Sequence, residues 1–323
     1  MRLLNTTYII PALALAFASC STKDAPEYVE PPEDYCLTDL SWRHPVTVSI
    51  IDDDVLDDGM TINYESKADQ MSRSIDEPRR RYVVKVFEPS TYKLVAEGVS
   101  FSKDITLSLP VGKLTVVVWA DYTTKETPSD SYYFTDDWTE LLLVDRFPYT
   151  ANDYMKSAAW SRIDIALAYN QTYIEIPLTQ IAGGFKLIST DAPNEKVESI
   201  DVCYNTAVPC AINGFSGEIA HTWSDCSFFG VTSTLANGDT QLCYDVLPVG
   251  NTGTNVSVSM TMRDADGRIV AHVNNIEIPV KPGKMTRVYA PFYSIREMHP
   301  SEVPGGGGVN INPGFNNEIV IEI

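Results

Sequence analysis

The chain has 323 residues, of which 43 are Asp or Glu and 24 are Lys or Arg, and its formal net charge is −19. This acidic balance excludes nucleic acid as a partner, because phosphate backbones require a basic surface. The length is sufficient for two domains of ordinary size, each with its own hydrophobic core.

The first twenty residues predict an exported lipoprotein. Arg2 supplies a positive charge, Tyr8–Phe17 is a short apolar run that contains Pro11, and two small residues precede Cys20. The run is too short for a transmembrane helix, so we expect residues 1–19 to be a cleaved signal peptide. Cys20 would then carry the lipid, and several acyl chains on one cysteine make an essentially permanent anchor. An ordinary secretory signal with Cys20 merely nearby is the alternative.

A prolyl and acidic segment follows the signal. Residues 20–44 contain Pro26, Pro31 and Pro32, and we expect them to form a flexible stalk. Beyond the stalk, short runs of β-branched and aromatic residues are separated by turn residues, which predicts an all-β fold. The strands expected in the first half are Thr47–Ile51, Thr61–Glu65, Tyr82–Glu88, Leu94–Val99, Ile105–Leu109 and Leu114–Tyr122.

A single segment, Asn152–Ile163, has helical character, with Asn152 as its N-cap. The second half returns to short alternating runs. The strands expected there are Tyr173–Leu178, Phe185–Ser189, Val197–Tyr204, Gln241–Leu247, Val256–Arg263, Arg268–Val273, Ile276–Val280 and Met285–Ala290.

A repeated tetrapeptide indicates two related domains. Leu247–Gly250 repeats Leu109–Gly112 residue for residue, and the two copies are about one β-sandwich length apart. We therefore predict one β-sandwich over residues 45–170 and a second over residues 171–298.

The final residues, 299–323, are expected to form a tail. Gly305–Gly308 is a flexible linker, and Val309–Ile311 and Glu318–Ile323 have strand composition.

The cysteines define no recognisable framework. Setting Cys20 aside leaves an odd number, and no C-x-x-C pair exists. Cys203 and Cys210 flank a stretch that contains Pro209 and could bridge neighbouring strands, although the sequence does not determine whether their Cα atoms approach closely enough.

Five stretches resemble the fimbrillin family, the lipoprotein-exported pilus subunits of Bacteroidetes, and within it the anchor or accessory type. They are the segment ending at Cys20, Arg81–Phe87, Leu109–Tyr122, Ile181–Leu187 and Ile278–Tyr289. The resemblance implies two tandem transthyretin-like Greek-key β-sandwiches with a C-terminal tail strand, on an outer-membrane lipoprotein. It also implies that other fimbrial subunits are partners through strand exchange, and that the protein supports adhesion to host or bacterial surface ligands.

The tail strand would be the donor in such an exchange. Ile319, Ile321 and Ile323 alternate, so they would share one face of a strand inserted into a partner's groove. The alternative is that the strand folds back to complete its own domain.

Fimbrillin shaft subunits are cut after an arginine, which removes an N-terminal strand. Arg73, Arg79, Arg80 and Arg81 precede the expected strand at Tyr82, where such a cut could act. An uncut, solvated loop is at least equally compatible, because anchor-type subunits keep their N-terminus.

No catalytic, metal or cofactor pattern is present, so we expect a non-enzyme. The four histidines lack an H-E-x-x-H arrangement, and Gly214–Gly217 falls short of the G-x-S-x-G elbow. The best alternative function is glycan binding. Tyr132, Tyr133 and Trp138 lie close together in the sequence and could form an exposed aromatic platform that stacks on sugar rings.

Overall fold

The computed structural model describes residues 43–52, 78–144, 149–295 and 318–322. The signal peptide, most of the stalk and Arg73 lie outside these residues. Nearly all regular structure in the described part is β-strand, with one 3₁₀ turn, η3 (Tyr154–Lys156). The all-β sandwich fold that the sequence predicts is confirmed.

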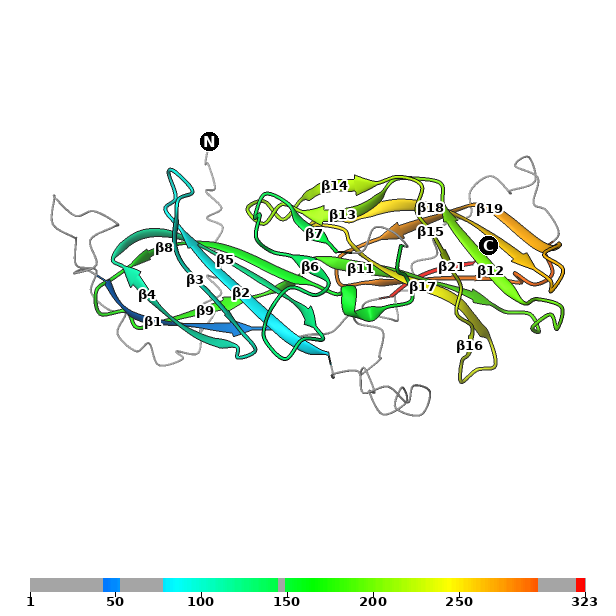
Figure 1. The fold of residues 1–323 in the computed structure, drawn as a ribbon, viewed down its shortest axis with the longest axis horizontal. Helices are drawn as coiled ribbons and strands as arrows, with labels where there is room; N and C mark the ends of the chain where they lie inside the picture. The colour runs from blue at the N-terminus through cyan, green and yellow to red at the C-terminus, as the bar shows by residue number, and fades with distance from the viewer. Residues whose placement is uncertain (1–42, 53–77, 145–148, 296–317, 323) are drawn as a thin grey trace, which may run out of the picture.

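Two sheets form the first β-sandwich (Figure 1). One has the strand order β4-β1-β9 and the other β10-β8-β5-β2-β3. Alternate residues of β1, Val46, Val48 and Ile50, are buried between the sheets, as strand periodicity requires. The bounds are β1 (Arg43–Ile51), β2 (Arg79–Phe87), β3 (Leu94–Ser100), β4 (Asp104–Pro110), β5 (Gly112–Thr123), β8 (Ala159–Leu167), β9 (Tyr173–Pro177) and β10 (Thr179–Gln180).

The second β-sandwich packs a five-stranded sheet, β16-β17-β11-β20-β21, against a four-stranded sheet, β15-β12-β18-β19. One buried apolar cluster joins these two sheets. It contains Phe185 and Leu187 of the five-stranded sheet and Val202 and Met260 of the four-stranded sheet. The bounds are β11 (Ala182–Ser189), β12 (Ser199–Tyr204), β15 (Ser227–Phe229), β16 (Ser233–Thr234), β17 (Thr240–Pro248), β18 (Thr254–Arg263), β19 (Ile269–Val280), β20 (Met285–Ala290) and β21 (Glu318–Glu322).

A fifth sheet joins the two sandwiches. Its order is β14-β13-β7-β6, and its strands are β6 (Tyr133–Phe134), β7 (Leu141–Leu143), β13 (Val208–Ile212) and β14 (Ile219–Trp223). The connection between β5 and β8 of the first sandwich therefore contributes two strands to this sheet: β7 pairs with β13 of the second half of the chain, and β6 pairs with β7.

The hydrophobic core of the second sandwich extends across this junction, whereas the interior of the first sandwich is a separate cluster. Val83 and Phe87 of β2 and Val117 and Trp119 of β5 belong to the same buried cluster as Phe185 of the second sandwich. The five-stranded sheet of the first sandwich is consequently covered on both faces. This explains why β5, which the sequence predicts as a central strand, is buried at every position except Lys113.

Strand pairing crosses the predicted domain boundary near residue 170 in both directions. β9 follows that boundary and pairs in parallel with β1, whereas β6 and β7 precede it and belong to a sheet with β13. The domain limits remain a prediction.

Most expected strands are present, and a few predictions differ from the structure. The expected strands Arg268–Val273 and Ile276–Val280 are one continuous strand, β19. The expected helix over Asn152–Ile163 is wrong: η3 is a single turn, and β8 begins at Ala159. β8 pairs with β5 along its whole length, and this tertiary pairing outweighs local helix propensity. Thr61–Glu65 and Val309–Ile311 lie outside the described residues.

Candidate functional site

The predicted donor strand is paired with its own chain. β21 runs parallel to β20, with Met285 opposite Glu318 and Tyr289 opposite Glu322. It is the outer strand of its sheet, so β20 lies between β11 and β21. Ile319 and Ile321 lie within β21, and Ile323 lies outside the described residues.

Parallel pairing limits how tightly β21 is held. β11, β20 and β21 form three neighbouring parallel strands, and parallel ladders are slightly less stable per residue than antiparallel ones. β21 contributes five residues to this ladder. If β21 leaves, the backbone N–H and C=O groups along one side of β20 lose their partners, and the edge becomes a template for another strand.

The N-terminal strand is held more firmly. β1 lies between β4, to which it is antiparallel, and β9, to which it is parallel. Val46 and Val48 are fully buried, and Ile50 is 3 % exposed. Burying each such side chain stabilises the fold by about 1.5–3 kcal/mol, so loss of β1 would expose two strand edges and an apolar groove.

Three of the four arginines proposed as processing sites, Arg79, Arg80 and Arg81, lie in a strand. β2 begins at Arg79, which is earlier than the sequence predicts. Arg79, Arg80 and Arg81 pair in register with Thr123, Tyr122 and Asp121 of β5. The solvated-loop interpretation of Arg79–Arg81 is therefore wrong. The guanidinium of Arg79 stacks on Phe101, and Arg80 donates to Asp52 at 2.9 Å.

Arg81 is the most deeply buried of the three. Its side chain is 1 % exposed, and Nε and Nη2 donate to the two carboxylate oxygens of Asp121, its cross-strand partner, at 2.7 and 2.5 Å. Arg81 also donates to Asp130, whose other oxygen accepts the N–H of Thr135. Bidentate pairing of this kind is strong and geometrically specific. An arginine held in this way cannot enter a protease active site while the strand remains folded.

Burial and hydrogen bonding act in opposite directions on the two carboxylates. Burial raises the pKa of Asp121 above its usual value, against the opposing effect of hydrogen bonds from Arg81 and Trp119. Burial also acts to raise the pKa of Asp130. Because Asp130 is less buried, hydrogen bonds from Arg81 and Thr135 outweigh that effect, and its pKa is lowered.

The aromatic platform is not formed. Tyr133 is fully buried and Trp138 is 4 % exposed, so neither can stack on a sugar from solvent. Tyr133 lies in β6, where its ring packs against Trp119 with centroids 5.1 Å apart and its hydroxyl donates to the carbonyl of Lys156 at 2.7 Å. Only Tyr132 is partly exposed.

The disulfide between Cys203 and Cys210 is also absent. Cys203 is an exposed free thiol on β12, whereas Cys210 is buried on β13, which belongs to a different sheet. Among the described residues, no group of three or more His, Cys, Asp or Glu side chains is arranged to hold a metal ion. No helix in the same part of the chain is long and apolar enough to cross a membrane.

Comparison with known sequences identifies the family. A sequence model of a family of unknown function, DUF6562, matches residues 55–323. The chain belongs to the DUF6562 family. Among curated proteins, none matches this DUF6562 chain.

Several solved structures are similar to this DUF6562 protein. The fimbrial anchor protein Mfa2 from Porphyromonas gingivalis has a TM-score of 0.43 and 14 % identity, covering 72 % of this chain and 82 % of that one. The tip fimbrial protein Mfa3 from the same organism has a TM-score of 0.38 and 12 % identity, with coverages of 73 % and 81 %. A fimbrial assembly protein from Parabacteroides distasonis has a TM-score of 0.38 and 10 % identity, with coverages of 76 % and 90 %. These are proteins of the class that the sequence resembles.

Proposed function

We propose that this DUF6562 protein is a surface-anchored fimbrial subunit of the anchor or accessory type. It is held to the outer membrane by lipid on Cys20 and joins other subunits by exchanging strand β21, and it supports adhesion without catalysing a reaction. The observation that carries this proposal is the position of β21, a C-terminal strand at the edge of its sheet in parallel pairing with β20.

The energetics of exchange favour a strand of this type. In the isolated subunit β21 occupies the edge of β20, and a neighbouring subunit's tail replaces it during assembly. Three alternating isoleucines buried in a partner's groove would contribute roughly 5–9 kcal/mol before ordering costs, at about 1.5–3 kcal/mol each. A new backbone ladder adds to this, as in other cases of strand addition.

The N-terminal half supports an anchor role over a proteolytically processed shaft role. β1 is paired on both sides, and Arg80 and Arg81 are engaged with Asp52, Asp121 and Asp130. An uncut chain keeps β1 connected to the stalk and to Cys20. The subunit would then bear the lipid at one end and the exchangeable strand at the other.

Site-specific photocrosslinking tests the exchange. The Cα atoms of Val320 and Arg287 are register partners between β21 and β20, so a photoreactive benzoylphenylalanine at position 320 reports which chain supplies the neighbouring strand. In cells that assemble fimbriae, we expect a crosslinked species whose mass corresponds to two subunits, with the second peptide derived from a β20 strand.

The same photoreactive residue at Glu277, an exposed position of β19, is the matched control and should give no such species. Crosslinks confined to single chains in assembled material would overturn strand exchange.

A further inference from the structure

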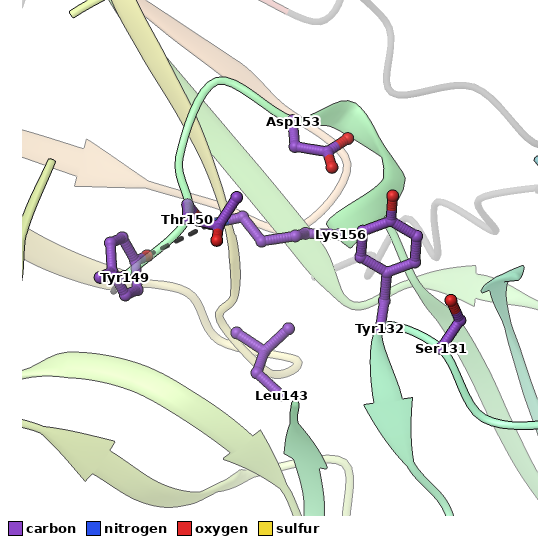
Figure 2. Close-up of a pocket in the computed structure, with 7 residues that line it drawn as sticks. All are labelled: Ser131, Tyr132, Leu143, Tyr149, Thr150, Asp153 and Lys156. Atoms are coloured by element: carbon purple, nitrogen blue, oxygen red, sulfur yellow. Dashed lines mark hydrogen bonds between the residues drawn. The ribbon is translucent and has the colours of Figure 1, made fainter. Parts of the chain in front are cut away.

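A pocket lies where the first sandwich's β5–β8 connection packs against the second sandwich. It has a volume of about 220 Å³ and is lined by Ser131, Tyr132, Leu143, Tyr149, Thr150, Asp153 and Lys156. All seven residues come from the connection that contains β6, β7 and η3. Figure 2 shows the side chains of Asp153 and Leu143 on opposite sides of this space, with the Tyr132 ring beside Lys156. Junctions between domains are common places for ligand sites.

Lys156 and Tyr149, which line one wall of the pocket, are bonded to the buried carboxylate of Asp245 behind it. Lys156 is 4 % exposed, and its ammonium group donates to Asp245, to the carbonyl of Thr150 at 2.8 Å and to the hydroxyl of Tyr149 at 3.3 Å. Asp245 also accepts hydrogen bonds from Tyr149 and Tyr204 at 2.7 and 2.6 Å. An ammonium group has three N–H donors, so those of Lys156 are all engaged. This wall is electrically balanced and offers no cation to an anionic ligand.

The remaining wall offers neutral hydroxyls, one carboxylate and an aromatic ring. One oxygen of Asp153 accepts the N–H of Met155 at 2.8 Å, which leaves the other as an acceptor for a ligand. Ser131 and Thr150 each carry a hydroxyl that donates and accepts. Tyr132 presents a ring with a polar tip, and Leu143 supplies an apolar surface.

This combination matches a sugar ring more closely than other small ligands. A pyranose has hydroxyls that donate to a carboxylate and exchange hydrogen bonds with Ser and Thr, and its C–H face packs on an aromatic ring. A carboxylate-bearing ligand would instead be repelled by Asp153, because the charge of Lys156 is already matched by Asp245.

We propose that this pocket binds a single neutral pyranose residue, such as the terminal sugar of a surface glycan. Asp153 accepts from the sugar hydroxyls, Ser131 and Thr150 orient them, and the ring of Tyr132 covers one face. The site differs from the exposed aromatic platform, since Tyr133 and Trp138 are buried and take no part. The inference goes beyond strand exchange and does not depend on it, so crosslinking through β21 and sugar binding can fail separately.

Saturation-transfer NMR on the full mature chain in detergent tests the proposal. The probes are the methyl pyranosides of glucose, galactose, mannose, fucose and N-acetylglucosamine, with methyl glucuronide as the charged counterpart. At about 10 mM, where a site of millimolar Kd is largely occupied, we expect at least one neutral pyranoside to bind and the glucuronide to bind more weakly.

Two variants test whether the sugar binds in this pocket. Asp153→Asn keeps the side-chain volume and an oxygen for Met155, and Tyr132→Ala removes the ring; each should weaken binding about tenfold or more. The controls Asp239→Asn and Tyr173→Ala change a half-buried carboxylate and an exposed ring elsewhere and should leave binding unchanged. If Tyr132→Ala lowers Tm, Asp153→Asn alone decides.

The proposal is overturned by absence of binding by every neutral pyranoside, by tighter binding of the glucuronide, or by binding that Asp153→Asn leaves intact.

Discussion

Asn152 and Tyr244 hold each other through three hydrogen bonds that join the β5–β8 connection to the edge of β17. The Asn152 N–H donates to the Tyr244 carbonyl at 2.9 Å, the Tyr244 N–H donates to Asn152 Oδ1 at 2.9 Å, and the Tyr244 hydroxyl donates to the Asn152 carbonyl at 2.5 Å. Asn152 Nδ2 also donates to the carbonyl of Phe229 at 2.8 Å. One residue thus covers a strand edge and links both sheets of the second sandwich.

Asn152→Gly should destabilise the protein by about 1–3 kcal/mol, because the N–H of the buried residue Tyr244 loses its acceptor and the Phe229 carbonyl loses its donor. The φ angle of Asn152 is +55°, a left-handed conformation that glycine adopts readily. Asn152→Ala loses the same bonds and adds about 1 kcal/mol of backbone strain. Urea unfolding of both variants separates the loss of the hydrogen bonds from the added backbone strain. Equal stability of wild type and Asn152→Gly would contradict the prediction.

Arg81→Met should cost about 3–5 kcal/mol, since it leaves the carboxylate of Asp121 buried without its cation. Replacing both residues in Arg81→Met/Asp121→Leu removes the buried carboxylate and should restore part of the stability, because Asp130 still lacks its cation and Trp119 Nε1 lacks its acceptor. Urea midpoints at neutral pH provide the comparison. A double variant no more stable than the single one would show that packing, not the isolated charge, is responsible for the loss.

Acid should weaken the contribution of Asp130 to the free energy of unfolding. Its pKa is lowered in the folded protein, where hydrogen bonds from Arg81 and Thr135 outweigh the effect of burial. The stabilising contribution is therefore present above the unfolded pKa of about 3.9 and is lost as the pH falls through the lower folded value.

Urea unfolding of wild type and Asp130→Asn across this range should show a difference in unfolding free energy that shrinks toward low pH. A constant difference would exclude this linkage.

Cys20→Ser should leave folding intact and release the protein from the outer-membrane fraction, because the lipid attachment site is lost. Cys36→Ser removes the other cysteine of the expected stalk and is the control, which should stay in the membrane fraction. Immunoblots of fractionated cells distinguish the two. Retention of the Cys20→Ser protein in the outer membrane would contradict lipid anchoring.

The central strands of this protein were predictable because strand periodicity and apolar runs are local properties. Leu114–Tyr122 reads as a buried strand in the sequence and is the core of β5. The repeated tetrapeptide also has a shared local structure, since Gly112 and Gly250 both adopt a positive φ, at 125° and 69°. Such a conformation favours glycine wherever it occurs.

The sites were harder to predict because they depend on which strands meet. Arg81 and Asp121 are forty positions apart and become partners only through the register of β2 and β5. Tyr133 and Trp138 read as candidates for an exposed surface, yet the sheet formed with β13 buries them. The pocket beside Tyr132 had no sequence signal, since its lining residues share no motif.

By itself, the amino-acid sequence determined the β class, the main strands and the negative net charge, because each depends on composition or on local periodicity. The resemblance to fimbrial proteins rests on five short stretches of the sequence. Only the tertiary structure decided that β8 is a strand and not a helix, that β21 pairs with β20 of its own chain, and that the outer face of the first sandwich's five-stranded sheet packs into the core of the second. These outcomes depend on pairing and burial between distant segments, whose free energies outweigh local propensity.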